Sequence, residues 1–167
     1  MKRTVRRARK SGAMRKVLLA LDAAKGSDAC VKICTRVFGA TPPKSLVLLH
    51  VQQLGGGPTL LHERMSDAEI DTLKEELGRS GALRTMEETA LAVLEVHRRK
   101  LARHGFTGIK TVVRTGHAAE EILAAAKEER VELIILGNTR GPVAKLMLGD
   151  IVKAVVNHTE VPVLLAR

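Results

Sequence analysis

Three glycines and one aspartate lie close together in the segment GNTRGPVAKLMLGD, residues 137–150. The segment follows the apolar run VELIILG and precedes the helical pattern IVKAVVNH. Glycine-rich turns between a strand and a helix bind phosphate because their backbone N–H groups and the helix N-terminus face the anion. Asp150 opposes this chemistry, since two like charges ~4 Å apart cost ~1 kcal/mol in water and several times more in a partly buried cleft. We also expect the Asp150 carboxylate to cap the following helix and occupy the anion position itself.

The other chemically capable residues form no recognised catalytic or metal-binding pattern. The six histidines are scattered without HExxH spacing, and no GxSxG, Walker A or GxGxxG sequence occurs. His50 lies in an apolar run and is expected to be a satisfied core residue, and His117 is expected to start a helix. Cys30 and Cys34 lack a nearby partner for zinc and are expected to be small buried side chains. We therefore predict no catalytic or metal-ligating residue, and the pattern leans against an enzyme.

Apolar runs and amphipathic segments alternate along the chain. Near-continuous apolar runs are typical of parallel strands that are covered on both faces. We predict strands over residues 16–22, 45–51, 109–114, 131–136 and 161–167, and helices after residue 27, over 66–103, 118–129 and 149–158. The pattern indicates an α/β fold with a doubly wound parallel sheet and right-handed crossovers.

Details of two predicted helices follow from their residue types. Ser27 is expected to cap the first helix, whose apolar residues Ala29, Ile33 and Val37 are expected to face inward. Ser66 and Glu69 have the spacing of a capping box, and the glycines within residues 78–81 are expected to break or kink the long helix.

Two strand ends carry residues suited to ligand binding. Asp22 follows the first predicted strand, and Gly137 follows the fourth. In doubly wound sheets ligands bind beyond the carboxyl ends of the strands, where the strand order reverses. Asp22 and the glycine segment would flank one crevice if these strands were neighbours, and the pattern alone leaves their order open.

The net charge of +10 is concentrated at the N-terminus. Residues 1–16 contain eight Lys or Arg and no acid, and the remaining 20 basic and 18 acidic residues nearly balance. We predict a basic extension over residues 1–13 and one folded domain over 14–167. Three interpretations of this basic segment are possible. It is a solvated disordered extension, it attracts nucleic acid or an anionic surface through residues 2–16, or it is a cloning remnant. No apolar run has the length of a transmembrane segment or signal-peptide core, and we expect a cytoplasmic protein.

From about Met14 to Arg167 the chain resembles the universal stress protein family. The matching segments are RKVLLALD, LVLLHV, VVRTGHAAEEILAAAKEERVELIILG and KLMLGDIVKAVVNHTEVPVLLAR. The resemblance implies a Rossmann-like fold of the adenine nucleotide alpha hydrolase type, with a five-stranded sheet of order 3-2-1-4-5 and helices on both faces. It also implies a stress-response or regulatory role and a homodimer formed through the last strand, Val161 to Leu165.

Members of this family that bind ATP share a glycine motif after the fourth strand: Gly, two residues, Gly, nine residues, Gly, then Ser or Thr. Here three residues separate Gly137 from Gly141 and seven separate Gly141 from Gly149, so the loop is one residue shorter. Asp150 replaces the hydroxyl residue. The resemblance places Asp22 beside the adenosine and Val51 near the adenine, so the adenosine half is retained while the triphosphate half is altered.

These comparisons define a candidate site and three functions. The candidate nucleotide-binding residues are Ala20, Leu21, Asp22, Val51, Gly137, Asn138, Gly141, Gly149, Asp150 and Ile151. The expected ligand is ATP or AMP, with Mg²⁺ if ATP is bound, and ATP affinity is expected to be lower than in members with the intact motif. The functions left open are a stress-response factor that binds an adenine nucleotide weakly, a nucleotide-independent dimeric interaction protein with a basic tail, and a slow ATPase.

Overall fold

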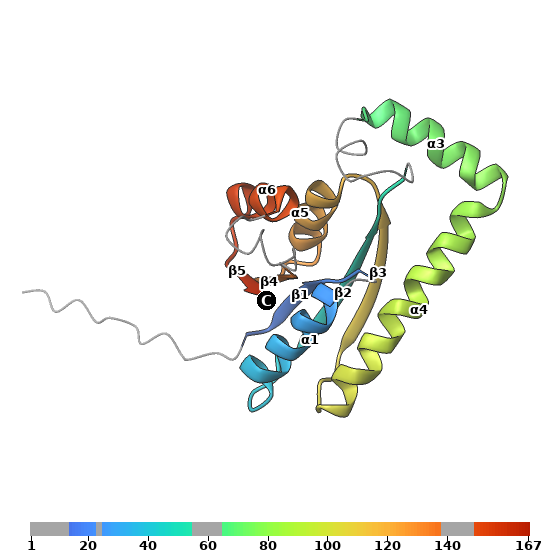
Figure 1. The fold of residues 1–167 in the computed structure, drawn as a ribbon. Helices are drawn as coiled ribbons and strands as arrows, with labels where there is room; N and C mark the ends of the chain where they lie inside the picture. Colours follow the sequence, from blue (N-terminus) through green and yellow to red (C-terminus); the bar gives the residue numbers. More distant parts are fainter. Residues whose placement is uncertain (1–13, 23–24, 55–64, 138–148) are drawn as a thin grey trace, which may run out of the picture.

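The computed structural model describes residues 14–22, 25–54, 65–137 and 149–167 (Figure 1). Strands and helices alternate as the sequence predicts. The elements in chain order are β1 (Lys16–Ala20), α1 (Lys25–Phe38), β2 (Ser45–Gln52), α3 (Asp67–Arg79), α4 (Ala82–Arg103), β3 (Ile109–Thr115), α5 (Ala118–Glu128), β4 (Leu133–Gly137), α6 (Asp150–His158) and β5 (Val163–Ala166). Among the described residues, none of the helices is both long and apolar enough to cross a membrane.

The five strands form one parallel sheet with the order β3-β2-β1-β4-β5, which confirms the predicted topology. β1 lies in the centre, where Leu18 is in register with Val47 of β2 on one side and with Ile134 of β4 on the other. The strand order therefore places the carboxyl ends of β1 and β4 next to each other. The chain leaves these two ends toward opposite faces of the sheet, and such a divergence opens a crevice.

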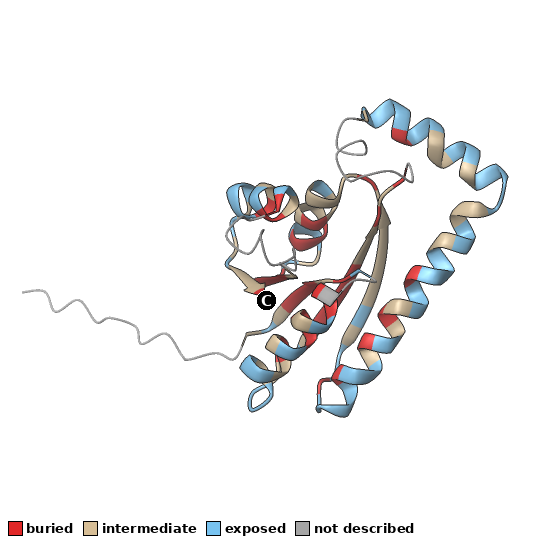
Figure 2. Cartoon of the chain, viewed as in Figure 1, coloured by how far each residue is buried: buried red, intermediate tan, exposed pale blue. Residues whose placement is uncertain are grey.

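Helices cover both faces of the sheet, α1 and α4 on one and α5 and α6 on the other (Figure 1). Alternate residues of β1 point to the two faces: Val17 and Leu19 contact the α1–α4 side, and Leu18 contacts the α5–α6 side. All three are fully buried. Burial concentrates along the strands and the sheet-facing sides of the helices, whereas most of α3 is exposed (Figure 2). Because helices cover both faces of the sheet, the strand residues are apolar at nearly every position in the sequence.

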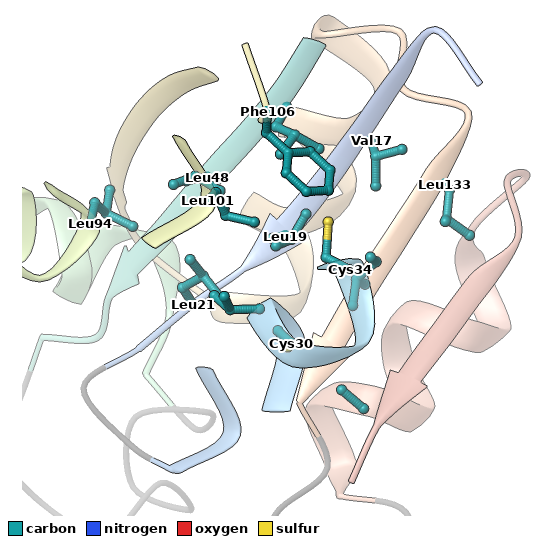
Figure 3. Packing of buried hydrophobic residues seen from close by; sticks show 14 residues of the cluster. Val17, Leu19, Leu21, Cys30, Cys34, Leu48, Leu94, Leu101, Phe106 and Leu133 are labelled. Atoms are coloured by element: carbon teal, nitrogen blue, oxygen red, sulfur yellow. The ribbon is translucent and has the colours of Figure 1, made fainter. Parts of the chain in front are cut away.

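The two cysteines lie in the core between α1 and the sheet (Figure 3). Cys30 and Cys34 are both fully buried and carry free thiols. Burial is the main cause that raises the pKa of each thiol to about 12. The prediction that they are small buried side chains is therefore confirmed.

The start of α1 differs from the prediction. The helix begins at Lys25, so Ser27 lies inside its first turn and does not cap it. Val37, predicted to face inward, is 51% exposed, because the inward stripe runs through Cys30 and Cys34. Ala29 and Ile33, the other two positions predicted to face inward, do pack against the core.

The long helical segment is broken where the glycines predicted. Ser66 and Glu69 form the capping box at the start of α3, with the Ser66 N–H donating to Glu69 Oε2 at 2.7 Å. α3 ends at Arg79, and Gly81 adopts a left-handed conformation (φ 74°) before α4 begins. A left-handed residue is favourable only without a Cβ. The turn allows α3 to point away from the direction of α4 (Figure 1).

Candidate functional site

A cleft of about 730 Å³ lies at the carboxyl ends of β1, β2 and β4. The N-terminal half of α4 forms one side of it, and the first turns of α5 and α6 also contribute. The cleft thus occupies the crevice between β1 and β4, where ligands of doubly wound sheets bind. It is the place that the sequence predicted from the positions of Asp22 and Gly137.

The structure brings together most of the predicted site residues. Those that line the cleft are Ala20, Leu21, Asp22, Val51, Gly137, Gly149 and Ile151. Asp150 is adjacent in sequence but does not line this cleft. Asn138 and Gly141 lie outside the described residues.

Asp22 is held at the rim of the cleft by Ser27. The Ser27 hydroxyl accepts a hydrogen bond from the Asp22 N–H at 2.6 Å. The same hydroxyl lies 2.7 Å from the Asp22 carbonyl oxygen and 3.0 Å from Oδ1, and it donates its single proton to one of them. Ser27 is only 2% exposed, whereas Asp22 is exposed. The buried serine therefore holds the backbone of an accessible acid and lies within hydrogen-bond distance of its carboxylate, a role that its assignment as a helix cap missed.

His50 is a cleft residue that the sequence reasoning placed only in the core. Its Nδ1 lies 2.9 Å from the carbonyl oxygen of Leu21, so the expectation of a satisfied histidine is confirmed at this atom. A carbonyl only accepts, so Nδ1 carries the proton and Nε2 of the neutral ring is an acceptor. His50 is half-buried and lines the cleft. Its position directly before Val51, at the carboxyl end of a strand, was the signal available in the sequence.

Gly137 is required by packing as well as by the loop that follows it. A Cβ at this position would lie 2.9 Å from both Cα and O of Gly26 in the first turn of α1. The end of β4 and the start of α1 therefore touch backbone to backbone, and both glycines line the cleft. This close approach accounts for one glycine of the motif without any ligand.

α4 supplies an apolar side of the cleft, here called the α4 wall, which the sequence did not predict. It consists of Thr85, Met86, Thr89, Ala90 and Val93. The two threonine hydroxyls donate to backbone carbonyls of the preceding turn, at 3.4 Å and 2.9 Å. With those hydroxyls engaged, the wall offers mainly methyl and methylene groups to the cleft.

The expectation that Asp150 caps the last helix is wrong. α6 begins at Asp150, and Gly149 is the N-cap, with no side-chain capping bond. A capping side chain comes from the non-helical residue that precedes the helix, and Asp150 already belongs to the first turn. Its carboxylate is half exposed and lies 3.7 Å from Nζ of Lys153. The negative charge of Asp150 at the start of α6 is thus partly balanced by the Lys153 ammonium.

Asp150 lines a second hollow of about 470 Å³, between α5 and α6, together with His117 and His158. His117 is the N-cap residue of α5, which confirms its predicted place at a helix start. His158 Nδ1 lies 2.7 Å from the Ala154 carbonyl oxygen. No group of three His, Cys, Asp or Glu side chains among the described residues has the geometry to hold a metal ion.

The described part of the cleft lining carries little formal charge. Asp22 is the only Asp, Glu, Lys or Arg among the described residues that line it. The described lining therefore offers no cation to balance a polyphosphate, and its positive potential is limited to backbone N–H groups such as those at the start of α6. Among the described lining residues, the Asp22 carboxylate thus repels a polyphosphate more strongly than a ligand with one phosphate.

Comparisons with known proteins agree with the fold and locate the family. The model of the universal stress protein family matches residues 14–167. Hypothetical protein MJ0577 has a similar structure, with a TM-score of 0.68 and 22% identity over 93% of this chain and 96% of its own. No curated protein matches the chain.

Two other solved structures share the fold and hold a nucleotide. A universal stress protein in complex with cAMP has a TM-score of 0.61 and 16% identity, over 93% of this chain and 98% of its own. A family member from Arabidopsis thaliana with AMP bound has a TM-score of 0.59 and 21% identity, over 91% of this chain and 90% of its own. Because the family model spans every described residue, this chain belongs to the universal stress protein family.

Proposed function

We propose that this protein is a stress-response factor that binds an adenine nucleotide of low charge, such as AMP, in the cleft between β1 and β4. The observation that carries the proposal is the cleft itself: an apolar space at the strand-order reversal, with one oriented carboxylate at its rim. The relatives solved with cAMP and with AMP support the choice of an adenine nucleotide.

The cleft has complementary groups for an adenosine. Val51, Met86 and Ile151 offer apolar surface to the faces of a purine ring. The Asp22 carboxylate accepts hydrogen bonds from ribose hydroxyls, and Nε2 of His50 is a further acceptor for a ligand donor. The Ser27 hydroxyl fixes Asp22 before the ligand arrives, which lowers the entropy lost on binding.

The described residues offer fewer groups for binding the phosphate of the ligand than for binding its adenosine. Gly149 and the first turn of α6 present backbone N–H groups to the cleft, which suits one phosphate. Asp22 repels added negative charge, and the described lining has no Lys or Arg to offset it. We propose that AMP binds at least as tightly as metal-free ATP, because each further phosphate adds negative charge that Asp22 repels.

Calorimetry with AMP tests this proposal. Asp22→Asn keeps the side-chain volume but replaces a charged acceptor, and hydrogen bonds to charged groups contribute about 1.5–3 kcal/mol, so AMP affinity should fall at least about tenfold. Asp71→Asn is the matched control, because Asp71 is an exposed residue of α3 outside the cleft and pairs with Lys74 of the same helix. Unchanged AMP affinity in Asp22→Asn, or equal losses in both variants, would contradict the assigned site.

We also propose that the protein forms a homodimer through β5. This strand is at the edge of the sheet, and its residues Val163, Leu164 and Leu165 are only partly buried. An edge strand with apolar side chains is a template for pairing with a second chain. Sedimentation equilibrium should give twice the chain mass of 18.1 kDa, and a monomer at micromolar concentration would refute the dimer.

A further inference from the structure

His97 is a buried histidine that the cleft does not use. It lies on the inner face of α4, between the fully buried Leu94 and Leu101, and is only 7% exposed. Leu94 and Leu101 point into the core beside Leu21 and Leu48 (Figure 3). The Nδ1 atom of His97 is buried without a hydrogen-bond partner among the described groups. A buried polar atom left unpaired is rare in native proteins and calls for an explanation.

The surroundings of His97 favour its neutral form. Burial lowers the pKa of His97 below its ordinary value, and the nearby Lys100 ammonium on the same helix lowers it further. Two carboxylates act in the opposite direction: Asp28 on α1 and Asp22 after β1. Asp28 is already engaged, because Lys100 Nζ donates to its Oδ1 at 2.7 Å. The neutral ring is thus the form that the packed interior accommodates.

His97 sits on the same helix as the α4 wall. Its neighbours Leu94 and Leu101 hold α4 in the core, and α4 packs on β2, β3 and α1. One to three turns earlier, the residues of the α4 wall face the cleft. Any change that weakens the packing of α4 around His97 therefore also changes the wall of the cleft.

We propose that His97 is an acid-sensitive positioning residue: when neutral it allows α4 to pack against the sheet and α1, and when protonated it loosens α4 and opens the cleft wall. Only the consequence for a ligand rests on the proposed nucleotide function. The packing change concerns the chain alone.

The direction of the pH dependence follows from linkage. In the unpacked state the His97 imidazole is protonated below about pH 6.5, the ordinary value. In the packed state its pKa is lower. The packed state therefore has its full stability above about pH 6.5 and loses stability as the pH falls from there toward the packed-state pKa. Each pH unit of that interval changes the opening equilibrium tenfold.

Hydrogen exchange of the ligand-free protein tests the inference. Amide protection of residues 82–103 is compared with that of residues 118–128 at pH 7.5 and 5.5, after correction for intrinsic exchange. In the wild type, α4 should lose at least about threefold more protection than α5 on acidification. His97→Leu should abolish this difference without loss of protection at pH 7.5, since leucine leaves no buried nitrogen unpaired.

Two further variants make the result specific. His97→Gln cannot be protonated and should also abolish the acid effect, which covers the case in which leucine packs poorly. His104→Gln removes the exposed histidine at the end of the same helix and should keep the wild-type acid effect. If both His97 variants lose α4 protection on acidification as the wild type does, the inference is overturned.

AMP binding at the same two pH values separates this inference from the proposed function. AMP affinity should fall on acidification in the wild type and in His104→Gln, by more than it falls in His97→Leu. If AMP does not bind at either pH while the acid effect on α4 depends on His97, the proposed function fails and the inference about α4 stands. Equal acid losses of affinity in wild type and His97→Leu would refute the link to the cleft.

Discussion

Replacing Gly137 with alanine should destabilise the fold, because β4 and α1 touch through their backbones at this position. The added Cβ would lie 2.9 Å from both Cα and O of Gly26, a separation that Cβ atoms essentially never show in real structures. Neither partner is a flexible side chain, so a strand or a helix has to shift. Overpacking of this kind costs up to about 3 kcal/mol. Alanine also lowers the conformational entropy of the unfolded chain. This effect raises the free energy of unfolding by about 0.4–1 kcal/mol at most, and only where the native backbone conformation suits alanine without strain.

The net loss for Gly137→Ala is therefore about 2 kcal/mol in the free energy of unfolding. For a domain of this size, each kcal/mol corresponds to roughly 2–4 °C, so Tm should fall by about 4–8 °C. Urea denaturation followed by circular dichroism measures the first quantity, and a thermal scan measures the second. The shift of α1 should also disturb the Ser27–Asp22 hydrogen bonds and weaken any ligand bound in the cleft.

Gly78→Ala is the matched control. Gly78 lies inside α3 with no atom within 4 Å of the position that a Cβ would take. In an open helical position alanine is more favourable than glycine by about 0.5–1 kcal/mol, so this variant should be slightly more stable than the wild type. If Gly137→Ala unfolds at the wild-type urea midpoint while Gly78→Ala behaves as expected, the close contact between β4 and α1 does not exist as described.

Three other changes test separate parts of the structure. Asp150→Ser should shift Tm by less than about 2 °C, since the Asp150–Lys153 pair is half exposed. The same substitution should tighten ATP binding by less than about tenfold in calorimetry. Weaker ATP binding in the presence of Mg²⁺ would instead make Asp150 a metal-assisted ligand residue. Burial raises the pKa of the Cys30 and Cys34 thiols to about 12, so both should react with a disulfide reagent at pH 8 only as fast as the protein unfolds. Rapid labelling of the native protein would contradict their packing. Any binding of nucleic acid or acidic vesicles should disappear when residues 1–13 are deleted and weaken steeply with added salt; binding that survives the deletion would place the interface on the folded domain.

The sequence predicted the elements because their local signals are strong. Apolar runs long enough for a buried strand, a capping box at Ser66 and glycines before Ala82 each depend on neighbouring residues alone. These signals were sufficient for an α/β fold, and the resemblance to a known family supplied the strand order that the pattern had left open. Asp22 and Gly137 could be grouped because the carboxyl ends of neighbouring parallel strands meet at one edge, once the resemblance had supplied the strand order. Val51 was added to this site by the resemblance alone, and the structure has all three residues lining the cleft.

Tertiary structure decided what the remaining residues do. The starts of two helices, which no local signal resolved, differ from the prediction by three residues at α1 and by one at α6. These shifts turned Ser27 from a cap into the partner of Asp22 and moved Asp150 from the cap position into the first turn. The α4 wall comes from a helix that packs over the sheet from a distant part of the chain, and its threonines and methionine carry no chemical signature in the sequence. His97 looks like any polar residue on an amphipathic helix until packing encloses it. Local sequence fixes backbone preference and periodicity, whereas burial and long-range contact depend on how the elements meet in space, and those contacts set the chemistry of the cleft.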